Sequence, residues 1–183
     1  SASSASVSHL QYFAVNSLNT SVVSSVSDIS TSFTPSASGG FDGVVTNNSL
    51  YLTWNGAGGT GIKAAALTSN FSLSSAVTIA SGSATIVSVT ADNTSSTPVI
   101  WSSWFNAGSN SFASAVATNQ TLQTLFSAQR LVGSNSPQIV NLTSTANNGL
   151  AKIYYELTNV YSYNFTTFKN YIALKSVSQT GSL

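Results

Sequence analysis

Short runs of alternating polar and apolar residues, separated by turn-forming dipeptides, constrain the fold of this chain more than any other feature. The clearest run is 49–54, where Leu50, Leu52 and Trp54 alternate with hydroxyl-bearing residues and Asn55-Gly56 follows at once. Such alternation is typical of a β-strand with one buried face, and Asn-Gly is a strong hairpin signal. Further strands are expected at 62–67, 71–79, 84–91, 99–105, 138–142, 150–157 and 168–177. About ten short strands predict an all-β fold, a jelly-roll-like β-sandwich with little helix.

Turn and helix signals refine this prediction. Asp42-Gly43 and Asn147-Asn148-Gly149 are expected as turns, the second leading into a hairpin. Residues 121–131 alone show helical spacing of apolar side chains, so a short helix is expected there.

The alternation also predicts which side chains face the core. In 99–105, Trp101 and Trp104 fall on opposite faces, so one is expected in the core and the other near the surface. In 168–177, Ile172 and Leu174 are expected to point inward and Lys175 outward.

The composition excludes several classes of partner. Charged residues make up 5% of the 183 residues, against a usual figure of about 25%, and the net charge is +1. Such a chain lacks the basic surface of a nucleic-acid binder and has little attraction for anionic membranes. No apolar run is long enough to span a bilayer. The surface must instead be built from hydroxyls and amides, since Ser and Thr number 58 and Asn 17.

Catalytic and metal-binding patterns are missing from the sequence. His9 is the only histidine and no cysteine is present, so neither a catalytic triad nor a zinc site can be assembled. Asp42 and Asp92 precede turn residues and are interpreted as backbone caps, although either could contribute to a calcium site. We therefore expect no enzymatic activity, no catalytic residues, no metal and no cofactor.

The N-terminal segment carries an unusual strand. Residues 7–15 place apolar side chains on both faces of an extended chain, and no adjacent hairpin partner is evident within the first thirty residues. The segment could pair with a distant strand of its own domain or complete the sheet of a neighbouring subunit. We divide the chain into an N-terminal donor strand with its linker (1–30) and a β-sandwich body (31–183). The candidate donor residues are Val7, His9, Leu10, Gln11, Tyr12, Phe13, Ala14 and Val15.

Seven Asn-X-Ser/Thr sequons are spread along the chain at intervals of 22–28 residues. Some are expected by chance in a sequence this rich in Ser and Thr, but several coincide with predicted turns, where glycans fit. Because the chain begins with Ser-Ala and not Met, we expect a processed, exported protein with covalent N-glycans. The candidate sites are Asn19, Asn47, Asn70, Asn93, Asn119, Asn141 and Asn164.

The Ser-Ala start, the lack of cysteine, the few charges, the dispersed sequons and the strands throughout together resemble the subunits of archaeal extracellular filaments. These are the donor-strand threads and bundling pili of thermoacidophilic archaea, and more distantly TasA-type bacterial fibres. The resemblance implies a head-to-tail homopolymer on the cell surface, with roles in adhesion or biofilm and contacts to other surface glycans or filaments.

Two other interpretations of the protein's function remain open. A carbohydrate-binding sandwich would present an exposed ring such as Trp104 or Tyr51 to a sugar, although aromatic residues in sandwiches are more often buried. An S-layer or virion coat protein would share much of the composition.

Overall fold

The computed structural model describes residues 11–13, 27–28, 40–70, 72–106, 112–131, 138–161 and 168–182. Its strands are β1 (Gln11–Tyr12), β2 (Ser27–Asp28), β3 (Phe41–Thr46), β4 (Ser49–Asn55), β5 (Ile62–Thr68), β6 (Val77–Ala80), β7 (Ile86–Asp92), β8 (Val99–Asn106), β9 (Phe112–Thr118), β10 (Gln129–Arg130), β11 (Gln138–Asn147), β12 (Leu150–Tyr161) and β13 (Phe168–Ser178). A single 3₁₀ turn spans Ala57–Gly59 within the described residues. The predicted all-β sandwich is confirmed.

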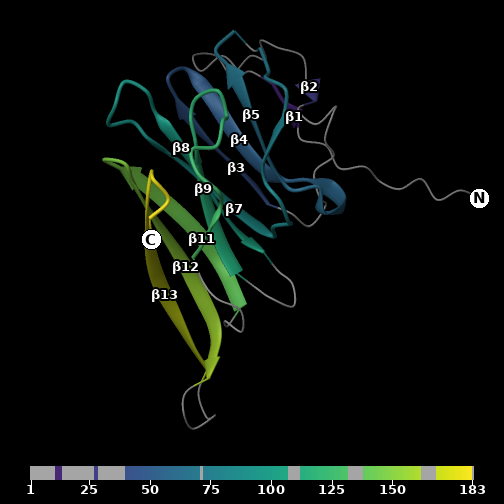
Figure 1. Cartoon of the computed structure of the whole chain (residues 1–183). Helices are drawn as coiled ribbons and strands as arrows, with labels where there is room; N and C mark the ends of the chain where they lie inside the picture. The colour runs from purple at the N-terminus through teal and green to yellow at the C-terminus, as the bar shows by residue number, and fades with distance from the viewer. Residues whose placement is uncertain are drawn as a thin grey trace, which may run out of the picture.

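Three antiparallel sheets make up the body (Figure 1). The first sheet has the order β3-β4-β5-β6, the central sheet β10-β9-β8-β7 and the C-terminal sheet β11-β12-β13. Neighbouring strands within each of these sheets follow one another in the chain, so each sheet is a meander.

The central sheet is buried on both faces, which makes the body three layers thick. Ile100, Trp104 and Val116 pack with residues of the first sheet in one core cluster. Trp101 and Phe105, from the opposite face of β8, pack with residues of the C-terminal sheet in a second cluster. The predicted separation of the two tryptophans onto opposite faces is therefore confirmed. The expectation that one lies near the surface is wrong, because Trp101 and Trp104 are 1% and 2% exposed.

Alanines on β9 make room for the larger side chains of β8. Ala113, Ala115 and Ala117 are almost fully buried and belong to the same cluster as Trp101. The Trp101 ring also contacts Phe126, with 5.8 Å between ring centroids and an interplanar angle of 53°. Large side chains of β8 thus lie beside small ones of β9 on the same face of the central sheet, which keeps this face closely packed.

Two hairpins turn on asparagine-containing pairs with left-handed backbone. Thr46 pairs with Ser49 across Asn47-Asn48, whose φ angles are 45° and 58°. In the C-terminal sheet, Asn147 pairs with Leu150. The intervening Asn148-Gly149 has φ angles of 52° and 73°. Both are two-residue loops of the type that matches the twist of paired strands, and the second confirms the predicted hairpin.

Two local predictions are wrong. No helix forms at 121–131, because the chain turns back on the end of β9, where the Leu125 N–H donates to the Ala117 carbonyl at 2.9 Å and Thr124 pairs with Thr118. The Asn119 carboxamide holds this turn by accepting the backbone N–H groups of Thr121 and Gln123 at 3.0 and 2.9 Å, and Leu122 adopts φ 63°. Asp42-Gly43 is not a turn but part of β3, where it pairs with Thr53 and Leu52.

The predicted facing of β13 is also wrong. Ile172 and Leu174 are 81% and 50% exposed, while Val177 is fully buried in the core. The register explains this, because Val177 lies opposite the buried Ala151, and Leu174 lies opposite Tyr154 on the other face. Lys175 is exposed, as expected.

Candidate assembly and glycosylation sites

The described part of the N-terminal segment forms a minimal antiparallel pair. Gln11 lies opposite Asp28 and Tyr12 opposite Ser27, so the expectation that the first thirty residues hold no pairing partner is wrong. The pairing covers only two residues on each strand, and Phe13, directly after it, is 55% exposed. Of the candidate donor residues, Val7, His9, Leu10, Ala14 and Val15 lie outside the described residues.

Strand β13 is the edge of the C-terminal sheet. It is 11 residues long and pairs with β12 on one side, and none of the strands that the structure describes pairs with its other side. An edge of this kind presents unpaired N–H and C=O groups that another strand can extend. The opposite edge of the same sheet, β11, is packed near β7 of the central sheet. Among the described strands β11 likewise has no partner on its outer side, but its proximity to β7 leaves β13 as the more accessible edge of this sheet.

The short β1–β2 pair and the open edge lie far apart. In Figure 1, β1 and β2 are on the side of the molecule next to the first sheet, while β13 borders the opposite side. A strand donated from one side of a subunit to an edge on the other side of the next subunit makes a head-to-tail contact, which builds a filament when the rotation between copies does not close a ring.

The outer face of the C-terminal sheet combines polar and apolar residues in cross-strand rows. One row runs Asn141–Glu156–Ile172 and the next Thr143–Tyr154–Leu174. Lys152 and Glu156 both lie on this face, and Tyr154 lies between them on the same strand. The sequence thus contained the signal that Tyr154 points outward, although it was not singled out.

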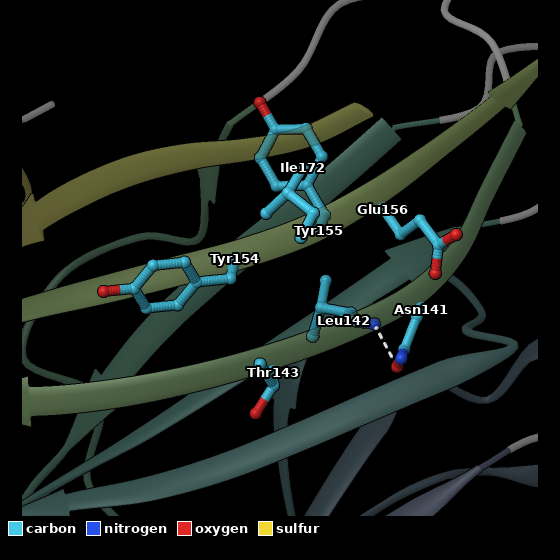
Figure 2. Close-up of a pocket in the computed structure, with 7 residues that line it drawn as sticks. All are labelled: Asn141, Leu142, Thr143, Tyr154, Tyr155, Glu156 and Ile172. Atoms are coloured by element: carbon cyan, nitrogen blue, oxygen red, sulfur yellow. Dashed lines mark hydrogen bonds between the residues drawn. The ribbon is translucent and has the colours of Figure 1, made fainter. Parts of the chain in front are cut away.

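A shallow hollow of about 290 Å³ opens on this sheet. Figure 2 shows Asn141 and Glu156 toward one end of the hollow and the ring of Tyr154 toward the other. The remaining lining residues are Leu142, Thr143, Tyr155 and Ile172. Tyr155 is buried, and burial raises the pKa of its phenol above the ordinary value. The hollow is lined mostly by apolar side chains, and its lining residues do not include a cluster of ionisable groups suited to catalysis.

Four sequon asparagines lie at one end of the sandwich. Asn47 occupies the β3–β4 turn, Asn70 follows β5, Asn93 follows β7 and Asn119 follows β9. Antiparallel pairing brings these strand ends together, since Ser49 pairs with Thr68 and Ile100 pairs with Thr118.

Hydrogen bonds differ among these four asparagines. The Thr46 hydroxyl donates to Asn93 Oδ1, which joins two of the sequon turns. The side chain of Asn119 is held by more hydrogen bonds than that of Asn93, because its Nδ2 also donates to Gln123 Oε1 at 3.1 Å. Asn47, Asn70 and Asn93 are exposed, as their prediction in turns implied. Asn19 and Asn164 lie outside the described residues.

The two aspartates of the body have structural hydrogen-bonding roles. Asp92, 4% exposed, accepts hydrogen bonds from Thr94 through the backbone N–H at 3.0 Å and the hydroxyl at 2.6 Å, and from the Gly149 N–H. Burial alone would raise the pKa of Asp92, but these hydrogen bonds outweigh it and lower the pKa below the ordinary value. Asp42 accepts from the Val89 N–H at 2.8 Å and so links β3 to β7. The interpretation as a turn cap is confirmed for Asp92, which accepts from Thr94 two residues on. For Asp42 it is wrong, because this residue lies within β3 and its carboxylate accepts backbone N–H groups of strands, not of a turn.

The rings proposed for sugar binding are not accessible. Tyr51 is 5% exposed and Trp104 is 2% exposed, so neither can stack on a carbohydrate, and the choice of these residues is wrong. They are buried because the first and central sheets meet at this interface. Burial also raises the pKa of Tyr51, against a smaller opposing effect of its hydrogen bond with Ser49.

In the part of the chain that the structure describes, no three His, Asp or Glu side chains gather as a metal site would require, and no helix has the length and apolarity to cross a bilayer. In comparisons with known proteins, no family model matches the sequence, and no curated protein or solved structure matches significantly.

Proposed function

We propose that the chain is a structural, non-enzymatic subunit of an extracellular filament. Residues 7–15 of one copy add to the open edge of β13 in the next copy, and repetition of this contact builds a head-to-tail homopolymer. The observation that carries the proposal is the 11-residue edge strand β13, which has no partner on its outer side among the described strands and exposes Ile172 and Leu174.

The dimensions of the two segments support strand addition. Nine extended residues reach about 30 Å and the eleven of β13 about 36 Å, at about 3.3 Å per residue. A donated strand would form main-chain hydrogen bonds along the edge, and its apolar side chains would flank the exposed Leu174. Residues 7–15 contain no Asp, Glu, Lys or Arg, so their addition beside Lys169 and Lys175 of β13 brings no like charges together.

The surface composition supports an extracellular setting. A net charge of +1 gives little electrostatic repulsion between copies, and hydrophilic glycans would keep such a surface soluble. Four of the sequons lie together at one end of the sandwich, where glycans would cover that end of the subunit. The same glycans would suit adhesion and biofilm contacts with other cell-surface glycans or filaments.

Negative-stain electron microscopy of the purified protein tests the proposal. The full chain should form uniform thin fibres, and a variant lacking residues 1–16 should remain as single subunits. A variant lacking only residues 1–6 is the matched control, because it keeps residues 7–15 and should still polymerise. Fibres formed by the variant lacking residues 1–16 would refute strand donation by this segment.

A further inference from the structure

One sequon differs from the others in its place in the fold. Asn141 lies within a strand, β11, on the outer face of the C-terminal sheet, whereas the other four described sequon asparagines follow strand ends. The pairing of β11 with β12 is irregular between Ile139 and Asn141. Such bulges redirect the side chains that follow them and are common beside functional sites.

The side chain of Asn141 is oriented by a hydrogen bond to its oxygen, which leaves its amide nitrogen accessible for modification. Its Oδ1 accepts a hydrogen bond from the Leu142 N–H at 2.9 Å, and the residue is exposed. Within the described residues Nδ2 donates no hydrogen bond, in contrast to Nδ2 of Asn119, which is bonded to Gln123. Thr143, the third residue of the sequon, lies on the same face two residues further along the strand.

Beside Asn141 lies an exposed apolar surface. Asn141 lies opposite Glu156, which lies opposite Ile172, and the 290 Å³ hollow is bounded by Asn141, Tyr154 and Ile172 among others (Figure 2). Ile172 is 81% exposed, which is unusual for a large aliphatic side chain on a sheet face. A sugar attached at Asn141 would enter this hollow and place its C–H faces against these apolar walls.

We propose that Asn141 carries an N-linked glycan whose first sugars lie in this hollow and cover Ile172 and Tyr154. The proposal rests on the export of the chain, which is part of the proposed function, but not on polymerisation. In the modification, Asn141 Nδ2 attacks the anomeric carbon of a glycosyl phosphate donor supplied by the host. The N–C bond forms, the C–O bond to phosphate breaks, the phosphate leaves with the electron pair, and one Nδ2 proton is lost to a base.

The first test is mass spectrometry of peptides from the protein purified from its native host. The peptide that contains Asn141 should carry a hexose- or hexosamine-based mass addition. Thr143→Ser, which keeps the sequon, should retain the addition, and Thr143→Val, which removes the sequon without changing Asn141, should lose it. An unmodified Asn141 peptide would overturn the proposal.

The second test asks whether the glycan packs on the sheet. Loss of the glycan in Thr143→Val should lower the Tm by about 2–4 °C relative to Thr143→Ser. In an Ile172→Ser background this difference should shrink to near zero, because the covered side chain is gone. Ser72→Ala, which removes the Asn70 sequon at an exposed position, is the control and should change the Tm by less than about 1 °C.

If the Tm difference between Thr143→Val and Thr143→Ser is unchanged in the Ile172→Ser background, the glycan points into solvent. That result would overturn the proposed packing of the glycan on the sheet. Electron microscopy separates this outcome from failure of the filament proposal, because Thr143→Val should still form fibres. If Asn141 is unmodified and Ile172→Asp abolishes the fibres, the hollow is a contact between subunits and the proposal is wrong.

Discussion

Asp92 provides the sharpest test of how the layers are held together. Its carboxylate lies at the end of β7 in the central sheet and accepts the N–H of Gly149, in the β11–β12 turn of the C-terminal sheet. In Asp92→Asn, one oxygen can still accept from Thr94, but the amide group turns a donor toward Gly149. Loss of a charge-assisted hydrogen bond and an unpaired buried N–H together cost about 2–3 kcal/mol.

Urea unfolding followed by tryptophan fluorescence measures this cost, because Trp54, Trp101 and Trp104 are all buried. At pH 7, Asp92→Asn should lower the free energy of unfolding by about 2–3 kcal/mol, and the exposed Lys152→Gln should change it by less than about 0.5 kcal/mol. An Asp92→Asn variant as stable as the original protein would refute the proposed role of the carboxylate.

The pH dependence gives a second readout for Asp92. Its pKa in the folded protein is lower than the unfolded value of 3.8, so its ionisation stabilises the fold above pH 3.8. This contribution is lost as the pH falls through the lower folded pKa. The stabilities of the original protein and Asp92→Asn should therefore converge in strong acid, and an undiminished difference there would contradict the assignment.

Three further outcomes are expected. Gly61→Ala should destabilise the fold by more than about 2 kcal/mol, because φ is +104° and a Cβ would lie 2.6 Å from the Ala80 carbonyl oxygen. Gly58→Ala, with φ +63° and open space around it, should cost only about 1 kcal/mol in the same denaturation assay; equal costs would contradict the steric argument. Leu174→Asp should leave unfolding within about 0.5 kcal/mol of the original, because the side chain is half exposed, but should reduce fibre formation in electron microscopy. Normal fibres from that variant would argue against β13 as the acceptor.

The sequence predicted local features better than the layer arrangement. Asn148-Gly149 specifies its turn directly, because both residues accept the left-handed backbone that a two-residue hairpin needs. The opposite faces of Trp101 and Trp104 follow from the strand period of two. That both are buried depends on sheets on either side of β8, which no local pattern reports.

The facing of β13 was mispredicted for a related reason. Ile172 and Leu174 lie on one face and Val177 on the other, so the sequence offers two apolar faces with no local criterion to choose between them. The choice is made by the register with β12, whose Ala151 and Ile153 face the central sheet. In the same way, the sequence located Asn141 as a sequon but could not place it beside an exposed apolar surface.

Intermolecular disulfide trapping tests the central claim most directly, because the chain contains no native cysteine. Cysteine is introduced at Gln11 or Phe13 in one set of variants and at Ile172 or Leu174 in another, and pairs are mixed before assembly and oxidation. A disulfide needs Cα atoms about 4.4–6.8 Å apart, so it reports pairing of adjacent strands. The account predicts covalent dimers in at least one mixed pair and none in either variant alone. Fibres that form without a cross-link in any mixed pair would contradict addition of the N-terminal strand to β13.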